Sequence, residues 1–547
     1  MELYAFGKKG IAMGKYDGNY FEEMSKQRQK REENERREKH AQYISRRIPE
    51  DVINALESGK LKKEQIDEIE RLPWEQLCTP PHINEAYAQK LLDERHVGLE
   101  DVKSRIMDYV YSDFRGGAAL LLVGPPGVGK TSIAIQIARA IKRPWYEIPL
   151  SGIASAHEIT GVDPTFSEAA PGEIVRAIKN TNSFYPLIIL DEIDKVGRST
   201  EHGDPQNALL EVLDTNRSSF RDRFLSIPID LSNFVFIATA NDLSDISPIL
   251  RDRLEIIEIG GYNKEAKKAI LSEQIIPQIT TTIMDSPKQS IHIDDSAIES
   301  IVSKYSITPG IRELYDMTDR ICRRANREYK TGHRKVNVTS NNLEAYLGKP
   351  KRLSFEREGI PIIGSANTAV LISTKYAKVI EIQAKVLEGN GTVICTGGIE
   401  GFAKEAVQIA TSLIRYHSLE LNISPEYFSH KDIHVHSEYH PLIKSNRCVS
   451  LAIFVAIISN IFKKKVPLRK MFVGELHLDG SIRYVSNIGD FLDAAIESNL
   501  GTAYISLDNI TFDKDLIAKY KTQIEIRPLE KITQLIDLVL DKEKDGL

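Results

Sequence analysis

The residues best placed to do chemistry form a glycine-rich run at positions 124–131, Gly-Pro-Pro-Gly-Val-Gly-Lys-Thr. Its spacing is that of a phosphate-binding loop, and it lies between a strand-like apolar stretch and a helix-like stretch. In such a loop backbone N–H groups approach the phosphates, the lysine neutralises their charge, and the threonine hydroxyl coordinates Mg²⁺. The run therefore predicts that the chain binds ATP with Mg²⁺. The predicted nucleotide contacts are Gly124, Pro125, Pro126, Gly127, Val128, Gly129, Lys130 and Thr131.

Two adjacent acidic residues, Asp191 and Glu192, follow the apolar run at 187–190. Two acids alone are typical of a solvated turn, but a buried strand downstream of a phosphate loop delivers them to the nucleotide. The first acid then joins Thr131 in holding Mg²⁺, and Glu192 polarises the attacking water. The pair therefore predicts that ATP is hydrolysed as well as bound.

The composition is that of an ordinary soluble globular protein, with 547 residues, 41% hydrophobic and 27% charged. This length predicts three or four folding units. A net charge of -5 argues against nucleic acid as the main partner. Four scattered cysteines have neither metal-site nor disulfide spacing, which favours a reducing cytoplasm. The longest apolar run, 448–462, is too short to span a bilayer and predicts a buried helix, without a membrane role.

The elements that must position the acids and the loop can be read from periodicity. Short apolar runs at 118–123, 186–190 and 234–238 alternate with helical stretches, which predicts an α/β fold with a parallel sheet covered by helices. Residues 264–347 show helical periodicity throughout, broken only at 306–310. They predict a small helical domain after the sheet.

Before the sheet, residues 24–47 carry dense mixed charge without Pro or Gly, which is typical of a solvated helix or a coiled-coil arm. A second helical stretch is expected at 49–71, a proline-containing linker at 78–81, and further helical spacing at 87–111. This part of the chain predicts a charged helical connector rather than a globular unit.

A mixed α/β region begins near residue 356, with strands expected at 368–373 and 377–387 and a helix at 401–417. We therefore divide the chain into an N-terminal arm and connector, a nucleotide-binding domain, a helical lid and a C-terminal α/β domain. The expected boundaries are 1–80, 81–262, 263–350 and 356–547.

Several motifs together resemble the ATPase module of Lon proteases, which are AAA+ ATPases. They are the loop at 124–131, Asp-Glu-Ile-Asp-Lys at 191–195, and the stretch 203–214, with further matches at 92–100 and 237–241. The resemblance implies a homo-oligomeric ring, expected to be a hexamer, that acts on unfolded or tagged protein clients. Lon normally carries a large N-terminal substrate-recognition domain, and we expect this domain to be absent here.

The resemblance also implies roles for single residues. Asn241 resembles the sensor that positions water against the γ-phosphate, and Arg312 resembles the second sensor carried by the lid. Arg253 resembles the finger that reaches into the adjacent subunit, with Arg251 as a nearby competitor. Each ATP site would therefore be completed by a neighbour.

In the family an aromatic residue in the central pore grips the polypeptide, and Phe166 occupies the matching stretch, 161–172. Lon usually has an aliphatic residue next, where this chain has Ser167. The alternative interpretation is a phenylalanine buried in a loop.

The C-terminal domain departs from the family where Lon has its Ser–Lys dyad. Residues 431–436 resemble the strand before the serine nucleophile, and 472–480 resemble the strand pair before the catalytic lysine. When the sequences are aligned without gaps from these anchors, the serine falls on Cys448 and the lysine on Gly489. The resemblance therefore implies a Lon-type peptidase fold in which both members of the dyad differ.

The chemistry of the dyad decides how serious this is, because the lysine must accept the nucleophile's proton and glycine cannot. A thiol, with a free pKa of about 8.5, ionises more readily than a hydroxyl and could work with His434 or His436. Ser450 is a possible shifted nucleophile but lacks the same lysine, and Lys444 matches a lysine that the family also has. In the other interpretation, Cys448 is simply a small apolar residue that opens a buried helix.

Three functions follow from these residues. The chain is an ATP-driven machine that unfolds and translocates polypeptides with an inactive peptidase fold, or an ATP-dependent endopeptidase acting through Cys448. The third is a nucleotide-gated scaffold that binds a partner through residues 24–47 with little turnover.

Overall fold

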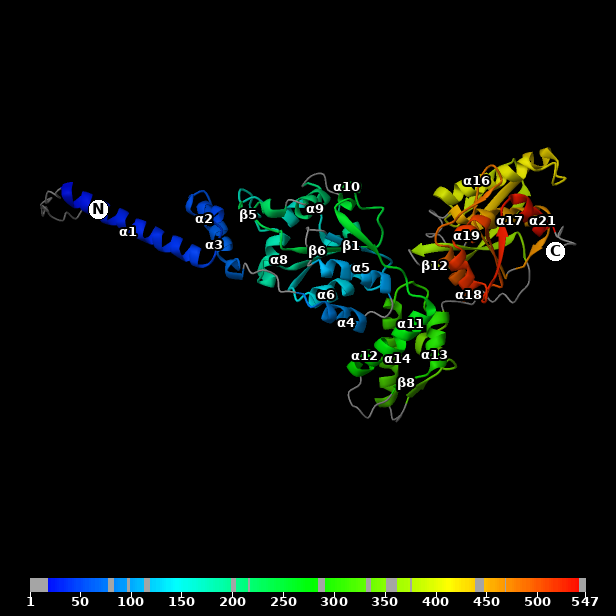
Figure 1. Ribbon diagram of the computed structural model, residues 1–547, viewed down its shortest axis with the longest axis horizontal. Helices are drawn as coiled ribbons and strands as arrows, with labels where there is room; N and C mark the ends of the chain where they lie inside the picture. Colours follow the sequence, from blue (N-terminus) through cyan, green and yellow to red (C-terminus); the bar gives the residue numbers. More distant parts are fainter. Residues whose placement is uncertain are drawn as a thin grey trace, which may run out of the picture.

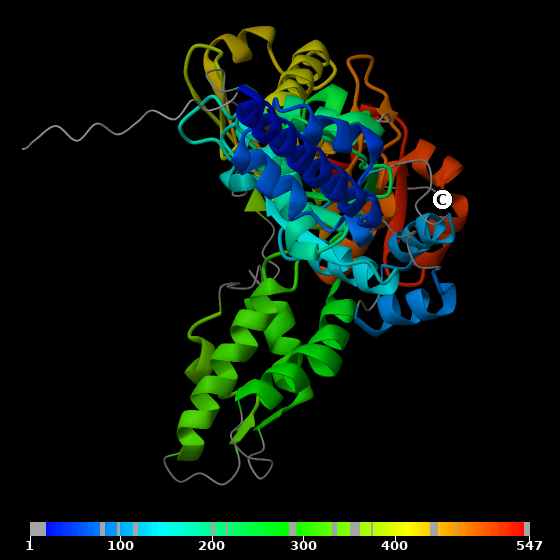
Figure 2. The ribbon, with the colours of Figure 1, turned by 90° about the vertical axis from the view of Figure 1, so that its left-hand side faces the viewer.

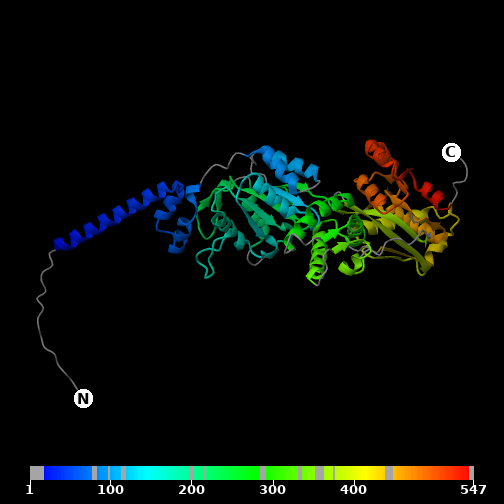
Figure 3. The ribbon, with the colours of Figure 1, turned by 90° about the horizontal axis from the view of Figure 1, so that it is seen from below.

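The computed structural model arranges the chain as a succession of units along one long axis, with the N-terminal arm at one end and the C-terminal sheet at the other (Figures 1 and 3). The green helices that follow the first sheet project away from both sheets (Figure 2). The structure describes residues 18–76, 83–95, 99–112, 119–197, 203–214, 217–283, 291–330, 336–350, 362–373, 376–437, 447–467 and 469–540.

The N-terminal arm is the long helix α1 (Gly18–Ser45), whose charged side chains between residues 24 and 40 are exposed, as predicted. The expected single helical stretch at 49–71 is instead two helices, α2 (Glu50–Glu57) and α3 (Lys63–Glu70). Gly59 stands between them with φ +68°, a left-handed conformation that ends a helix. The apolar faces of α2 and α3 join the core of the nucleotide-binding unit.

The first sheet has five parallel strands in the order β2-β3-β6-β1-β7. Their bounds are β1 Ala119–Val123, β2 Trp145–Pro149, β3 Leu187–Asp191, β6 Val235–Ala240 and β7 Leu254–Glu258. Alternate residues of β1 enter different cores: Leu121 packs on one face, while Leu120 and Leu122 pack on the other. Burial on both faces explains why these strands read as continuous apolar runs.

Helices alternate with the strands of this unit, as predicted, and the expected helical stretch at 87–111 is two helices. Their bounds are α4 Glu85–Arg95, α5 Glu100–Tyr111, α6 Lys130–Ala140, α7 Ala156–Thr160, α8 Glu173–Thr181, α9 Pro205–Leu213 and α10 Pro248–Arg251. Short antiparallel strands β4 (Phe220–Arg221) and β5 (Pro228–Ile229) form a separate ribbon. Helix α6 starts directly at the end of the glycine-rich run, which places that run at the carboxyl edge of the sheet.

The next unit corrects the prediction that residues 264–347 are helical throughout. Strands β8 (Ile291–Ile293) and β9 (Val336–Val338) pair in parallel between the helices. Each is a short apolar-polar-apolar triplet whose apolar residues are β-branched, and a helix-length window hides this period of two. The helices are α11 Lys264–Ile270, α12 Ile276–Ile283, α13 Asp295–Ser300, α14 Arg312–Lys330 and α15 Leu343–Leu347.

The C-terminal unit has a mixed sheet of seven strands in the order β13-β14-β12-β11-β16-β19-β20. The strands are β11 Ser365–Ser373, β12 Tyr376–Glu388, β13 Val393–Thr396, β14 Lys431–Ser437, β16 Lys470–Val473, β19 Thr502–Ser506 and β20 Glu525–Leu529. The main helices are α16 Gly401–Tyr416, α17 Ser450–Ile461, α18 Ile488–Glu497, α20 Lys514–Tyr520 and α21 Ile532–Val539. Helix α17 is buried along its length, as its apolar sequence predicted.

Within the described ranges, none of the helices is both long enough and apolar enough to cross a membrane.

Candidate active site

The glycine-rich loop connects β1 to α6 and has the backbone that phosphate binding requires. Gly127 and Gly129 adopt φ values of +80° and +96°, in the left-handed region that glycine enters without strain. At Gly124 a Cβ atom would lie 2.2 Å from the carbonyl oxygen of Ile259, so only glycine fits. Because α6 begins at Lys130, the unpaired N–H groups of its first turn face the loop and attract an anion.

The Lys130 side chain lies folded into the loop and is only 9% exposed. Its Nζ donates to the carbonyl oxygens of Gly124 and Pro125 at 2.8 and 3.0 Å and to Asn241 Oδ1 at 2.9 Å. Burial lowers the pKa of the Lys130 ammonium, and the nearby carboxylates, led by Asp194, oppose that shift. The ammonium is thus held by weak neutral acceptors, which the charged oxygens of a phosphate can replace.

The acid at the end of β3 is fixed by two hydroxyl groups. Asp191 Oδ1 accepts hydrogen bonds from Thr131 Oγ1 at 2.8 Å and from Thr239 Oγ1 at 2.7 Å. Thr239 Oγ1 also accepts the N–H of Glu192 at 3.0 Å, so one buried threonine on β6 places both acids. The oxygens of Thr131 and Asp191 are hard ligands of the kind that Mg²⁺ takes beside phosphates and water, and the pair fits the expected metal role.

Glu192 has an unusual backbone for a residue with a side chain, with φ 56° and ψ 52°. Such strain is found where surrounding structure forces it, often at functional sites. The residue is partly exposed, and the described residues offer no hydrogen bond to its carboxylate, so the group stays available to water. This is the arrangement that a water-polarising base needs.

Asn241 follows β6 and points its amide toward the loop. Its backbone N–H donates to Asp194 Oδ2 at 3.1 Å, and Asp194 is 5% exposed with its Oδ1 lacking a hydrogen bond among the described residues. Neither Asp194 nor Thr239 was singled out from the sequence. The signal that could have found them is a polar residue inside or directly after an apolar strand.

Arg312 is brought to the loop from the helical unit. A Cβ built on Gly127 would lie 3.0 Å from the Cβ of Arg312, and the N–H of Ile311 donates to the Gly127 carbonyl at 2.9 Å. Gly310 is equally tight, since a Cβ there would lie 2.5 Å from the carbonyl oxygen of Pro126. The start of α14 therefore rests on the phosphate loop itself.

Arg253 lies at the other edge of the sheet. It precedes β7, where Leu254 pairs with Ala119 at the start of β1, whereas the loop follows Val123 at the end of β1. Arg253 Nη1 lies 3.2 Å from Asp214 Oδ1 and its side chain is 38% exposed, while Arg251 is less exposed. The structure therefore gathers the other predicted ATPase residues but leaves Arg253 outside this chain's own site.

A pocket that the sequence did not predict lies beside the loop. Tyr262 lines it, and the Tyr262 hydroxyl donates to the Val128 carbonyl at 3.1 Å. Its mostly apolar walls, next to a phosphate loop, suit the flat face of a nucleotide base. The lining residues are Leu99, Glu100, Asp101, Val102, Gly260, Gly261, Tyr262, Asn263 and Ala266.

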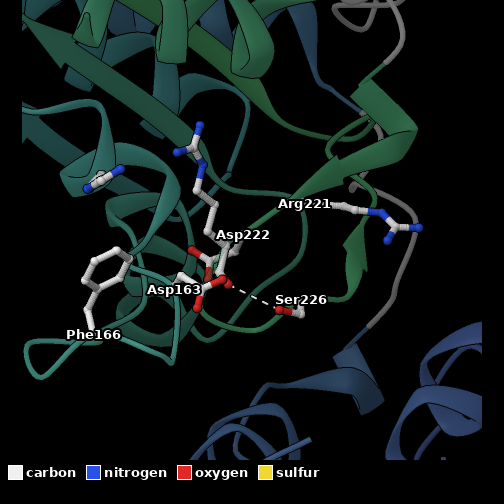
Figure 4. A pocket seen from close by; sticks show the side chains of 7 residues that line it. Asp163, Phe166, Arg221, Asp222 and Ser226 are labelled. Carbon is white, nitrogen blue, oxygen red and sulfur yellow. Dashed lines mark hydrogen bonds between the residues drawn. The ribbon is translucent and has the colours of Figure 1, made fainter. Parts of the chain in front are cut away.

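Phe166 lies in the loop between α7 and α8 and is 61% exposed. The alternative of a phenylalanine buried in the loop is therefore wrong. Figure 4 shows its ring at the outer side of a pocket, with Asp163 and Asp222 beyond it. An exposed aromatic on a short, ordered loop is available to contact another polypeptide.

The thiol at the family's serine position is closed off from solvent. Cys448 is 5% exposed, its Sγ lies 3.5 Å from the carbonyl oxygen of Ala369 on β11, and burial raises its pKa to about 12. His434 Nε2 and His436 Nδ1 instead lie 2.8 and 2.9 Å from Thr396 Oγ1 on β13. Strand β12 separates β14 from β11, so the structure does not bring these histidines to the thiol.

The other peptidase positions are structural in their contacts. The Ser450 hydroxyl donates to the Gly474 carbonyl at 2.9 Å and accepts the Leu476 N–H at 2.8 Å. Gly489 lies in the first turn of α18, where a Cβ would stand 3.5 Å from the Tyr520 hydroxyl. Lys444 lies outside the described residues.

Comparison with known proteins assigns both halves of the chain. Residues 337–542 match the Lon protease (S16) C-terminal proteolytic domain, and residues 120–261 match the ATPase family associated with various cellular activities (AAA). The Lon protease of Trichlorobacter lovleyi is 32% identical over 487 residues, which cover 87% of this chain and 59% of that protein. The Lon protease of Mycolicibacterium smegmatis is 32% identical over 526 residues, covering 90% and 67%. The chain thus spans less than two thirds of the first relative and about two thirds of the second.

The parallel sheet, its phosphate loop and the acids that end β3 define an AAA ATPase, here joined to an α/β unit of the Lon peptidase fold. The chain belongs to the Lon protease family. The family and the fold class predicted from the sequence are thereby confirmed.

Proposed function

We propose that this protein is a ring-forming machine that uses ATP hydrolysis to unfold and translocate polypeptides, and that its peptidase site is inactive. The contrast that carries the proposal lies between the two sites. The ATPase residues converge on one loop, whereas the nucleophile position is a buried thiol with glycine at the position of its base.

The steps at the ATP site follow from the contacts of the loop. Lys130 exchanges its carbonyl partners for phosphate oxygens, and Glu192 orients the attacking water. Mg²⁺, held through Thr131 and Asp191, would neutralise charge on the phosphates. Asn241, which contacts the Lys130 ammonium in this state, then becomes free to sense the γ-phosphate.

Two residues connect hydrolysis to movement. Arg253 stands at the opposite sheet edge and is exposed, which supports a role in the site of an adjacent subunit, with six subunits expected in the ring. Arg312 rests on the phosphate loop, so a change at the nucleotide moves the helical unit. Exposed Phe166 is the residue that would grip an unfolded or tagged client.

One experiment tests the proposal and its rivals. The purified protein is given ATP, Mg²⁺ and a fluorescent folded client with an unfolded tag, and ATP turnover, client unfolding and peptide release are followed. We expect unfolding in the wild type, none in Lys130→Ala, and no peptide release in either.

Each rival has its own signature in the same assay. Peptide release that Cys448→Ala abolishes would establish the endopeptidase instead. A wild-type ATP turnover no higher than that of Glu192→Gln would exclude the ATP-driven machine and support the nucleotide-gated scaffold.

A further inference from the structure

The loop that carries Phe166 closes at a narrow base formed by two glycines. The N–H of Val162 donates to the Ala170 carbonyl at 2.9 Å, which joins the two legs of the loop. A Cβ on Gly172 would lie 2.6 Å from the nitrogen of Gly161, so the legs touch where the loop leaves the domain. This base is where the two legs of the loop join the domain, and Lys62 also donates a hydrogen bond to the Pro164 carbonyl within the loop.

The carboxylate of Asp222 lies against both legs. Its Oδ2 accepts the N–H of Gly172 at 2.8 Å, and a Cβ on Gly161 would stand 2.7 Å from the same oxygen. Its Oδ1 accepts the N–H of Leu225 at 2.9 Å, and Asp222 is 0% exposed. Figure 4 shows Asp222 between Asp163 of the loop and Ser226 of the following turn. One oxygen of this buried acid therefore bonds to the base of the loop, and the other bonds to the turn 222–226 that carries the acid.

The turn that bears Asp222 is itself anchored. The N–H of Arg223 donates to the Thr160 carbonyl at 2.7 Å, and the N–H of Ser226 donates to the Asp222 carbonyl at 2.8 Å. Gln65 of α3, which is buried, donates its amide to the Phe224 carbonyl at 2.7 Å. The N-terminal helices thus hold the far side of the turn.

A buried carboxylate whose bonds are to backbone N–H groups is costly to keep, because burial disfavours its charge. Burial indeed raises the pKa of Asp222 to about 6, although hydrogen bonds from the backbone of Leu225, Gly172 and Phe224 oppose the shift. If position 222 served stability alone, a neutral side chain would avoid the cost of burying a carboxylate there.

We propose that Asp222 is a positioning residue for client handling: it clamps both legs of the 161–172 loop, so that the loop transmits force to the polypeptide gripped by Phe166. This inference rests on the proposed translocation function. Asparagine at position 222 keeps one acceptor oxygen but turns an N–H donor toward a backbone N–H. Whichever way the amide turns, the N–H of Gly172 in the loop or that of Leu225 in the turn faces a donor, so Asp222→Asn weakens the attachment of the loop base while the fold is retained.

The test compares Asp222→Asn with Asp230→Asn, an exposed acid that accepts only the N–H of Ser232 in its own turn. We expect Asp222→Asn to keep basal ATP turnover and to lower the thermal unfolding midpoint by about a few degrees, because one buried N–H loses its acceptor. Client unfolding should fall by about tenfold or more, since small misplacements of a working group have effects of this size. Asp230→Asn should match the wild type in all three measurements. Client unfolding at the wild-type rate in Asp222→Asn, or a loss of ATP turnover in parallel with the loss of client unfolding, would overturn the proposal.

Limited proteolysis separates this inference from the function on which it rests. Cleavage within 161–172 should be faster in Asp222→Asn than in the wild type and Asp230→Asn, whether or not a client is unfolded. Faster cleavage, with no client unfolding by the wild type, would refute the translocation function and keep the clamp. Unchanged cleavage would refute the clamp.

Discussion

The ATP site and the peptidase-fold site both lie where a helix begins near a sheet. Their reactive side chains differ in the kind of hydrogen-bond partners that hold them. Lys130, Asp191 and Asn241 are held by neighbours whose bonds a ligand can take over. Cys448 and Ser450 are held by backbone groups of the core. The reactivity of a side chain in this protein therefore depends on its hydrogen-bond partners as much as on its chemical type.

The largest effect is expected where the first site depends on another copy of the chain. Arg253→Ala should lower ATP turnover by about 10³-fold or more, as for fingers that stabilise the transition-state charge. Since Arg253 stands at the opposite sheet edge, mixing Arg253→Ala with Glu192→Gln should restore turnover at about a quarter of the sites if subunits mix at random. Arg251→Ala is the matched control. Failure of the mixture to exceed both variants would show that Arg253 acts within its own subunit.

The second effect concerns the buried thiol. With a pKa of about 12, Cys448 should react with iodoacetamide at pH 8 about 10³-fold more slowly than the same cysteine in urea, because the thiolate is the reactive form. The folded pKa lies above the ordinary value of 9, so the fold should also lose stability as pH rises above about 9. Mass spectrometry of labelled peptides checks the rate. Rapid labelling of the native protein would show that the Cys448 thiol is reactive in the folded state. The difference proposed between the two sites would then be wrong.

The third effect tests the strained acid. Glu192→Gln should lower ATP hydrolysis by about 10²-fold while ATP binding is kept, since the amide retains the shape but cannot polarise water equally. Fluorescent nucleotide binding and phosphate release measure the two properties. Asp242→Asn, at an exposed acid that accepts only its own turn's Ser244 N–H, is the control. Loss of binding together with hydrolysis would mean that Glu192 shapes the loop instead.

The fourth effect is one of stability. Ser450→Ala leaves the buried N–H of Leu476 without its acceptor, which should cost about 1–3 kcal/mol of unfolding free energy. Ser272→Ala, on an exposed helix face, should cost close to nothing. Urea denaturation of the two variants provides the comparison. Equal stabilities would remove the evidence that Ser450 is structural.

The smallest expected effect is on peptide cleavage after the dyad residues are restored. Restoring the family's residues with Cys448→Ser and Gly489→Lys should leave peptide cleavage at background, because the nucleophile position stays buried and a longer side chain at 489 meets Leu516 and Tyr520. A fluorogenic peptide assay with and without ATP reads the result. Cleavage above background would show that the dyad alone was missing.

Sequence reasoning succeeded where the signal is local. The loop glycines, the two acids at the end of β3 and the mostly apolar helix α17 could be predicted because each signal depends on neighbours along the chain. It missed Thr239, Asp194 and the pocket at Tyr262, because these matter only through contacts with distant residues. It also offered His434 and His436 of β14 as partners of the Cys448 thiol, since only the strand order shows that β12 lies between β14 and β11.

The burial of α17 has a consequence for how the chain is made. This helix packs on β11 and β12, which leave the ribosome before it, and on β16 and α21, which leave after it. The nascent chain therefore carries a mostly apolar helix with one side uncovered until α21 has been synthesised. Fragments that end soon after Ile461 should aggregate, and the C-terminal unit should complete its folding only once α21 has left the ribosome.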